Sequence, residues 1–285
     1  MKVLRKGILN NKKEVRFAQG WLNLFANQNL VVDGSFGTKS ELATIAYQKS
    51  VGLPPTGRID IPTQTKMGFR QTQNSKIVVL EIPFSKIEKA DVLWTDGVGG
   101  SVKSHAQAGG FDICWNGALF ENKTKEVCQL MVINGAVKHW GMRFKGIAYP
   151  TDLSAYPLNG LPKGIFGCHV DTISGKPYDM QGAAPCLIEN YAFAKEEYNL
   201  GYRSVNGAGS TARNCTAVTD TSILLFFSIF GCTLMEMAKE GLYQRVKFMQ
   251  NNDGGGSQSL YMDGSFILTT DGRTIPACIG LKIKQ

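Results

Sequence analysis

The spacing of apolar residues divides the chain into a helical first quarter and a longer, strand-rich remainder. In residues 15–25 the apolar positions recur every three or four residues, as on one face of a helix, and residues 42–47 repeat this spacing. After a break at two consecutive prolines, residues 62–69 can form a short third helix. The pattern therefore predicts a small three-helix domain over residues 1–70.

Residues 71–76 are polar and aperiodic, which is the composition of a linker, and beyond them the pattern changes. Apolar runs separated by Gly, Asn-Gly and Asp-Gly turns are typical of β-strands. These runs are KIVVLEIPFS, QLMVINGAVKHW, ILLFFSIF and SLYMDGSFILTT. Helical spacing returns at residues 100–110 and 233–250. We therefore predict an α+β chain, in which the three-helix domain is followed by a mixed α/β domain over residues 77–285.

Two predicted helices begin with the pattern of a capping box, a Ser or Thr followed three residues later by Glu. In the first, Thr38 and Glu41 predict that Thr38 is the N-cap. In the second, Thr233 and Glu236 predict the same arrangement.

The charge balance is basic, with 31 Lys and Arg against 23 Asp and Glu and a formal net charge of +8. Such a balance favours a polyanionic partner: nucleic acid, an anionic membrane or an anionic wall polymer. The basic residues are scattered and no aromatic-basic motif accompanies them, so we expect no nucleic-acid partner. The longest apolar run, SILLFFSIFGCTLM, is too short to span a bilayer, so we expect no membrane insertion.

The seven cysteines form no CxxC pair, and several lie in apolar runs. We interpret them mostly as buried free thiols of a reducing compartment. The first fifteen residues lack the apolar core of a signal peptide. We therefore expect a protein made in the cytoplasm without a signal peptide.

Several common chemistries are absent from the sequence. It has no phosphate-binding GxxxxGK[ST] motif, no HExxH and no G-x-S-x-G. The three histidines do not have metal-ligand spacing, so no zinc site is expected. His169, in FGCHVD, stays a candidate for lining a site.

The stretch QNNDGGGSQSLYMDG is the most unusual local feature. Its three glycines, Gly254, Gly255 and Gly256, would let the backbone and its N–H groups approach a phosphate or sugar closely. Asp253 lies at the boundary before them, and Ser257 adds a hydroxyl. A flexible turn explains the glycines about as well.

Residues 7–69 resemble the small three-helix peptidoglycan-binding domain of many cell-wall hydrolases. The matching elements are Leu22-Asn23, DGSFGTKS, Tyr47-Gln48, Gly52-Leu53, Thr56-Gly57 and Thr63. Gln19-Gly20 departs from the apolar-Gln pair that is usual there. The resemblance implies peptidoglycan binding, whereas the alternative is a small helical bundle with similar turns.

Residues 77–283 resemble the phosphodiester glycosidase family in the order of their motifs. These are ICWNG, GAAPCLIEN, STAR before a strand pair, and DGGGS after a helix. Arg213 is followed by Asn-Cys, where the family has a small hydroxyl residue and Ala, and Leu119 stands where an aromatic is usual. These departures affect the identity of the substrate more than the type of reaction.

This resemblance implies cleavage of a bond between an anomeric carbon and a phosphate oxygen. Asp253 would supply the carboxylate that stabilises the positive charge developing on the sugar. Arg213 and the glycine N–H groups would hold the phosphate, and Asn116 a sugar hydroxyl or N-acetyl group. Glu189 is a candidate second carboxylate. Each residue also has an alternative, purely structural role: Asp253 could cap a turn, Arg213 could form an ion pair, and Asn116-Gly117 could form a turn.

The sequence thus predicts a glycosidase directed to the bacterial cell wall, where it hydrolyses a sugar-phosphate or related bond in a teichoic acid-like polymer. A phage lysin (endolysin) fits the same features. The alternatives are a peptidoglycan glycan hydrolase on the same scaffold and a non-catalytic wall- or carbohydrate-binding protein. No cofactor is expected, although an oxygen-lined site at Asp253 could take a divalent cation.

Overall fold

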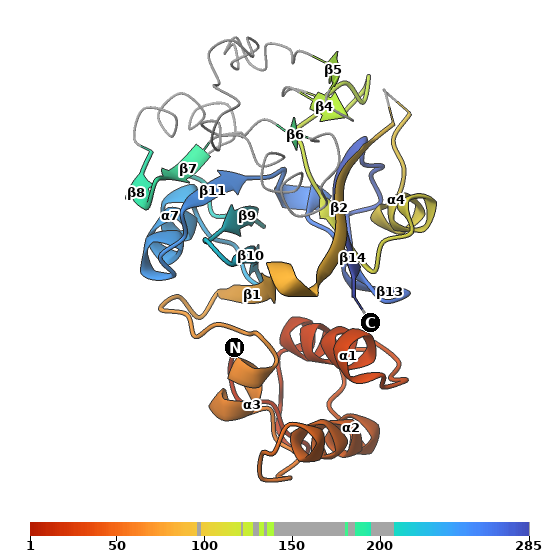
Figure 1. Ribbon diagram of the computed structural model, residues 1–285, viewed down its shortest axis with the longest axis vertical. Coiled ribbons are helices and arrows are strands. Elements are labelled where there is room, and N and C mark those ends of the chain that lie inside the picture. The colour runs from red at the N-terminus through yellow and green to blue at the C-terminus, as the bar shows by residue number, and fades with distance from the viewer. Residues whose placement is uncertain are drawn as a thin grey trace.

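The computed structural model describes residues 1–95, 98–120, 122–127, 131–133, 136–139, 180–181, 186–194 and 208–284 (Figure 1). The chain has an N-terminal helical module and a larger module built from antiparallel sheets, so the predicted α+β class is confirmed.

The N-terminal module consists of three helices: α1 (Lys12–Ala26), α2 (Thr38–Ser50) and α3 (Ile61–Lys66). The side chain of Asn11 caps α1 by accepting from two backbone amides of its first turn, and Asp60 caps α3 by accepting from Thr63. Three helices were predicted here, and the structure confirms all of them.

Only one of the two predicted capping boxes forms. Thr233 accepts from the backbone of Glu236 while the Glu236 side chain accepts from the backbone of Thr233, as predicted. The prediction at Thr38 is wrong, because Gly37 is the N-cap of α2 and Thr38 is already its first helical residue. The turn ends one residue earlier than the pattern indicated, and a glycine has no side chain with which to cap.

The second module contains two larger sheets and a small third one, all with antiparallel pairing between the described strands. The first sheet runs β1 (Ile77–Pro83), β10 (Ser222–Ser228), β9 (Asn214–Val218), β11 (Phe248–Asn251), β7 (Cys186–Glu189) and β8 (Ala192–Phe193). The second runs β13 (Ser265–Leu268), β12 (Leu260–Met262), β3 (Ile113–Asn116), β14 (Ala277–Ile283) and β2 (Ile87–Trp94). The third runs β5 (Ala136–His139), β4 (Met131–Ile133) and β6 (Met180–Gln181).

The continuous apolar run of β10 is explained by its central position between β1 and β9. Successive side chains of a strand point to opposite faces, and here both faces are covered. Ile223, Leu225 and Phe227 join a core shared with the N-terminal helices. Leu224 and Phe226 pack instead in the cluster that includes helix α7 (Leu234–Tyr243).

The helix predicted over residues 233–250 is shorter than the sequence indicated. Helix α7 ends at Tyr243, and Arg245 adopts a left-handed conformation with φ 54°. The chain then reverses into β11, which starts at Phe248 and pairs with β7 and β9. Val246, which falls within the predicted helix, is buried but lies in this reversal.

Helix α1 packs directly on the second module rather than standing apart from it (Figure 1). The rings of Phe17 and Phe227 lie 5.8 Å apart between centroids. A β-carbon at Gly20 would come within 2.3 Å of the Cδ1 atom of Ile267, so this glycine allows the helix to approach β13. The two modules therefore share one hydrophobic core.

The connecting segment 71–76 is held against α7. The buried carboxylate of Glu240 accepts hydrogen bonds from the backbone amides of Gln73 and Asn74, each at 3.1 Å. Gln244 donates to the carbonyl of Gln71 at 2.8 Å. A polar, aperiodic composition predicted a free linker, but its polar groups serve to dock the segment on the second module.

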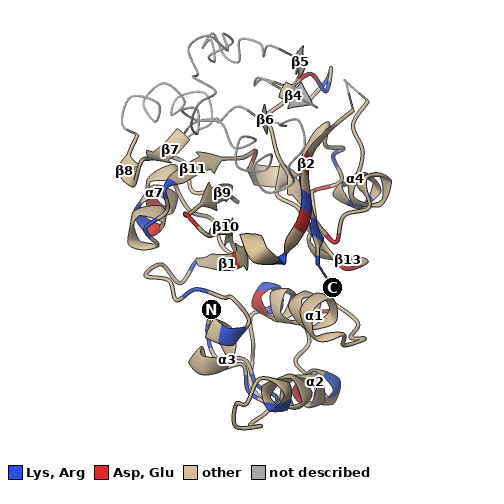
Figure 2. Ribbon diagram, in the orientation of Figure 1, with Lys and Arg blue, Asp and Glu red and all other residues tan. Residues whose placement is uncertain are grey.

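Lys and Arg residues occur on helices and strands of both modules, as do Asp and Glu (Figure 2). None of the helices that the structure describes is long and apolar enough to cross a membrane. The five cysteines within the described residues are buried and free, as predicted for those positions: Cys114, Cys186, Cys215, Cys232 and Cys278.

Candidate active site

Residues 252–259, which we call the Asp253 turn, join the two large sheets. The turn leaves β11 of the first sheet and enters a short 3-10 helix at Gly255–Ser257, before β12 of the second. The backbone N–H of Asp253 donates to the carbonyl of Gly117 at 2.8 Å. That contact ties the turn to the end of β3 in the second sheet.

Asn116, the last residue of β3, fixes the same turn with its side chain. Its Nδ2 donates to the carbonyl of Asp253 at 2.7 Å. Its Oδ1 accepts from Asn214 at 2.7 Å and from the backbone of Ser259 at 2.8 Å. The residue is fully buried. The structure thus brings Asn116 to Asp253 but directs its amide to protein atoms, a positioning arrangement rather than the sugar contact expected from the sequence.

At two of the three glycines the protein's own atoms approach closely, backbone at Gly254 and flexible side-chain ends at Gly256. A β-carbon at Gly254 would lie 2.5 Å from the carbonyl oxygen of Ala212. A β-carbon at Gly256 would lie 1.9 Å from the Oδ2 atom of Asp271. Gly255 has φ 58°, a left-handed conformation that favours glycine. Each glycine therefore has a steric or conformational reason that needs no ligand.

The glycine N–H groups are largely engaged within the protein. Gly254 donates to the Oδ1 atom of Asp253 at 3.0 Å, and Gly255 donates to the carbonyl of Ala212 at 2.7 Å. Ser257 donates its N–H to the carbonyl of Gly254 at 3.1 Å. The expectation that the run presents several free amides to a phosphate is not met at Gly254 and Gly255, because the tight turn uses them.

The carboxyl of Asp253 has an unusual proton affinity. Burial among protein atoms raises its pKa from 3.8 to about 6, although the residue retains part of its surface in contact with solvent. The Ser257 hydroxyl, the Gly254 amide and the charges of Arg273 and Arg213 favour the ionised form but do not offset this burial. A carboxyl of this kind in an accessible turn is typical of functional sites.

Arg213 precedes β9 and is almost fully buried beside the turn. Its Nη2 donates to the carbonyl of Gly209 at 3.2 Å, and its backbone N–H donates to the hydroxyl of Ser228 at 2.7 Å. Its side chain also touches the glycine run, since a β-carbon at Gly254 would lie 3.6 Å from its Cδ. The structure therefore brings Arg213 and Asp253 together, as the sequence predicted.

Arg273 is a second cation at this site, and the sequence analysis missed it. It forms a two-pronged ion pair with Asp271, with N–O distances of 2.7 and 2.6 Å. Its Nη1 lies 3.5 Å from the hydroxyl of Ser257, which in turn bonds to Asp253. No motif marks the Asp-Gly-Arg sequence, and it is the hydrogen bond from the N–H of Asp271 to the carbonyl of Gly256, at 3.0 Å, that holds it at the site.

Two other candidates are not placed at this site. His169 lies outside the described residues, and so does the side chain of Glu189, which ends β7. His105 is buried on helix α4 (Val102–Gly109), where its Nε2 lies 2.8 Å from the carbonyl of Ile275. Within the described part of the chain no group of three His, Cys, Asp or Glu residues could hold a metal ion.

Comparison with known proteins gives a family match within the N-terminal module. Residues 11–67 match a family model described as "Putative peptidoglycan binding domain". No curated protein matches the chain.

Two solved structures resemble the fold. One is the catalytic domain of zebrafish N-acetylglucosamine-1-phosphodiester alpha-N-acetylglucosaminidase, auto-inhibited by its pro-peptide, with a TM-score of 0.50 and 16% identity. The likeness covers 73% of this chain and 76% of that one. The other is a hypothetical protein from Synechocystis, with a TM-score of 0.55 and 14% identity, covering 76% of this chain and 61% of that one. The N-terminal module thus resembles a peptidoglycan-binding domain in sequence, and the second module shares its fold with the zebrafish domain.

Proposed function

We propose that the second module is a glycosidase that hydrolyses a sugar-phosphate bond in a bacterial wall polymer. The observation that carries this proposal is the Asp253 turn, in which a buried carboxyl with a pKa of about 6 lies beside two arginines, on a residue that is itself partly exposed. A carboxylate next to paired guanidinium groups suits a substrate with a sugar on one side of the bond and a phosphate on the other.

The proposed reaction adds water to the anomeric carbon and breaks the bond from that carbon to the phosphate oxygen. The phosphate leaves with the bonding electron pair, and the water's proton is released. The ionised Asp253 stabilises the positive charge that builds on the sugar. Because a phosphate is a good leaving group, no strong general acid is needed.

Arg213 and Arg273 would both bind the phosphate, the first as a fixed contact and the second as an exchangeable one. Arg213 is buried and fixed by its bond to Gly209, so it forms the floor of the site. Arg273 is held by Asp271 in an ion pair whose two side chains are 32% and 51% exposed, which makes the pair weak and exchangeable. A phosphate could therefore replace Asp271 as the partner of Arg273.

The N-terminal module would keep this activity at the wall. The peptidoglycan-binding match at residues 11–67 and the net charge of +8 both fit an anionic wall as the place of action. We further propose that the protein is a lysin made in the cytoplasm, an endolysin of the phage kind. Purified wall suspensions should then lose turbidity, and an unchanged suspension would refute the lysin part.

Product analysis tests the activity. Wild-type protein and Asp253→Asn should be incubated with peptidoglycan that carries teichoic acid and with peptidoglycan stripped of it, followed by mass spectrometry of released fragments. Glu88→Gln is the matched control, because Glu88 is an exposed carboxylate outside the Asp253 turn. The proposal expects free sugar or phosphomonoester ends from the first substrate only, lost in Asp253→Asn and retained in Glu88→Gln.

Each other result identifies a different function. Glycan fragments with new reducing ends from both substrates would make the protein a peptidoglycan glycan hydrolase. Fragments that persist in Asp253→Asn would refute the assignment of the carboxyl. No product from either substrate would leave a wall-binding protein without catalysis.

A further inference from the structure

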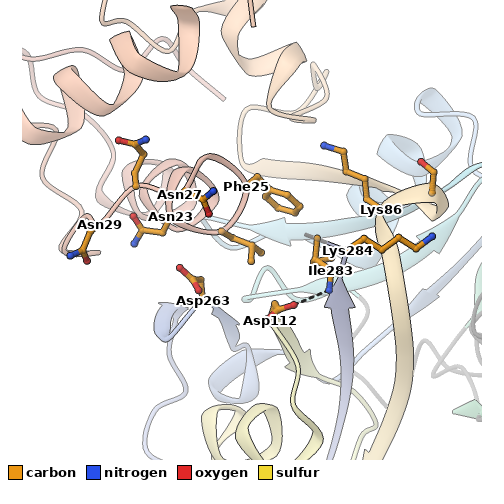
Figure 3. Close-up of a pocket in the computed structure, with 12 residues that line it drawn as sticks. Asn23, Phe25, Asn27, Asn29, Lys86, Asp112, Asp263, Ile283 and Lys284 are labelled. Carbon is orange, nitrogen blue, oxygen red and sulfur yellow. Dashed lines mark hydrogen bonds between the residues drawn. The ribbon is translucent and has the colours of Figure 1, made fainter. Parts of the chain in front are cut away.

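An open groove of about 610 Å³ separates the end of α1 from the second module (Figure 3). One wall comes from residues 23–29, at and beyond the end of the helix. The opposite wall comes from the 3-10 turn η1 (Phe84–Lys86), from Asp112 just before β3, from the end of β14 and from the turn after β12. The groove thus depends on the way in which the two modules share a core, and neither module forms it alone.

Three exposed polar side chains of the groove are not used by hydrogen bonds within the described part of the protein. The side chains of Asn27, Asn29 and Asp263 are exposed to solvent and donate to or accept from no described residue. Asp112, by contrast, is already used, because it accepts from the backbone of Ile283 at 2.8 Å and from Lys282 at 2.9 Å. Asp263 is therefore the acid of the groove that remains free for a ligand.

Positive charge lies away from this acid. Lys86 and Lys284 line the groove on the side of Phe25 and Ile283, whereas Asp263 lies below Asn23 and Asn27 in the view of Figure 3. The ammonium of Lys86 lies 5.5 Å from the centroid of the Phe25 ring. The groove therefore separates a cationic end from an acidic, amide-rich end.

A second, smaller cavity lies beside the cationic end. It has a volume of about 170 Å³ and shares Phe25 and Lys86 with the groove. Apolar side chains of both modules contribute to its lining, among them Trp21, Met67 and Ile82. Its size suits a small alkyl group.

The backbone around the groove is held in place. Asn27 has φ 50° and donates its N–H to the carbonyl of Leu22. Asp263 has φ 43° and donates its N–H to the carbonyl of Asp112 at 2.9 Å. Both residues thus lie in tight turns fixed by hydrogen bonds, so the groove is preformed and a ligand need not order it.

We infer that this groove binds a short peptide that carries a free ammonium, a free carboxylate and small alkyl side chains. Asp263 and the neighbouring amides take the ammonium and peptide groups, Lys86 and Lys284 take the carboxylate, and the small cavity takes an alkyl side chain. The uncross-linked stem peptide of peptidoglycan has this chemistry. The inference rests on the proposed wall-directed function and names the part of the wall that the junction recognises.

The location of the groove relates binding to cleavage. Asp112 immediately precedes β3 and Asn116 is its last residue, four positions later, which is about 13 Å along a strand. Asn116 holds the Asp253 turn at one end, and Asp112 and Asp263 lie at the groove at the other. A polymer anchored through its peptide would thus be kept within a short reach of the Asp253 turn.

Isothermal titration calorimetry on the full chain tests the inference. The probes are a soluble disaccharide-tetrapeptide from peptidoglycan and the same disaccharide without its peptide. Binding is expected for the first probe only, and it should weaken about three- to tenfold in Asp263→Asn and in Lys86→Ala. Glu88→Gln is the control, since this exposed carboxylate lies two residues from Lys86 but does not line the groove.

Two results would overturn the inference: equal affinity for the disaccharide without peptide, or unchanged affinity in both groove variants. The titration should also be run with Asp253→Asn, so that turnover cannot consume the probe. If the glycosidase proposal fails, peptide binding still appears in this experiment. If the groove proposal fails, the product analysis of wild-type protein still reports on hydrolysis.

Discussion

The side-chain amide of Asn116 donates to the backbone carbonyl of Asp253 at 2.7 Å, across 137 positions of sequence. Asn116 ends a strand of one sheet, and Asp253 follows a strand of the other. The carboxyl is therefore positioned by the meeting of two sheets, which places the candidate chemistry where the two halves of the module are joined. The accuracy of that junction should control both stability and activity.

Replacing Asn116 by alanine should reduce both the stability and the activity of the protein. The change removes an acceptor from Asn214 and from the Ser259 amide, and a donor from the Asp253 carbonyl. Leaving buried polar groups without partners costs about 1–3 kcal/mol each, so we expect a loss of about 2–4 kcal/mol after relaxation. Urea unfolding measures it, with Gln107→Ala on the exposed surface of α4 as control. A loss no larger than that of the control would contradict the positioning role.

Asp253→Asn should make the protein more stable at neutral pH while removing activity. The folded state raises the pKa of Asp253 from 3.8 to about 6, so the folded chain binds this proton more tightly than the unfolded chain. The ionised carboxyl therefore lowers stability as pH rises from about 4 to 6, and this cost is fully present above pH 6. Removing it should stabilise the fold at pH 7 by about 1–3 kcal/mol, allowing for partial solvent access. Thermal unfolding at pH 7 and pH 4 checks the sign, because the gain should vanish at the lower pH.

Hydrolysis by the wild-type protein should depend on the same carboxyl. If the ionised form is required, the rate should be level above the pKa of about 6 and fall as the pH drops through it. One unit below the pKa about a tenth of the groups is ionised, so the rate should be about tenfold lower. A profile of kcat against pH tests this. A rate that rises on acidification would instead assign Asp253 to the role of a proton donor.

Alanine substitutions at two positions of the glycine run should have different effects, one on stability and the other on activity. Gly254→Ala would push a β-carbon against the rigid backbone of Ala212, whereas Gly256→Ala meets only the mobile ends of Asp271 and Arg273. The first should therefore destabilise the fold by about 1–3 kcal/mol. The second should leave stability nearly unchanged but displace Arg273 and lower kcat.

Unfolding and rate measurements on both glycine variants distinguish the two cases. Gly37→Ala is the control, because a β-carbon there meets open space. Full activity in a folded Gly256→Ala protein would show that the position of Arg273 does not matter.

These examples show which parts of the structure the sequence could predict. Local periodicity gave the three N-terminal helices and the strand runs, since both depend on neighbouring residues. Helix α7 ends at Tyr243 because the chain must turn there to pair as β11, a distant contact that local spacing does not reveal.

In the candidate site, too, some residues could be found from local sequence and others could not. Asp253 and Arg213 were found from short motifs, and the structure brings them together. Arg273 was missed because no motif marks its Asp-Gly-Arg sequence, and its role depends on how Asp271 meets the backbone of Gly256. Asn116 was expected to contact a sugar but instead positions the Asp253 turn. This could not be predicted because its partners Asn214 and Ser259 are remote in sequence.

The docking of the connecting segment gives a last prediction, that the two modules unfold as one unit. Glu240 is buried and accepts from Gln73, Asn74 and Gln244, so Glu240→Ala should cost about 2–4 kcal/mol and loosen the segment. Hydrogen exchange followed by mass spectrometry, in increasing denaturant, reports separately on helix α1 and strand β10. The two should open together in the wild type because Phe17 and Phe227 share a core, and α1 should open earlier in the variant. Glu88→Ala should behave as the wild type, whereas separate opening of α1 in the wild type would show that the shared core does not couple the modules.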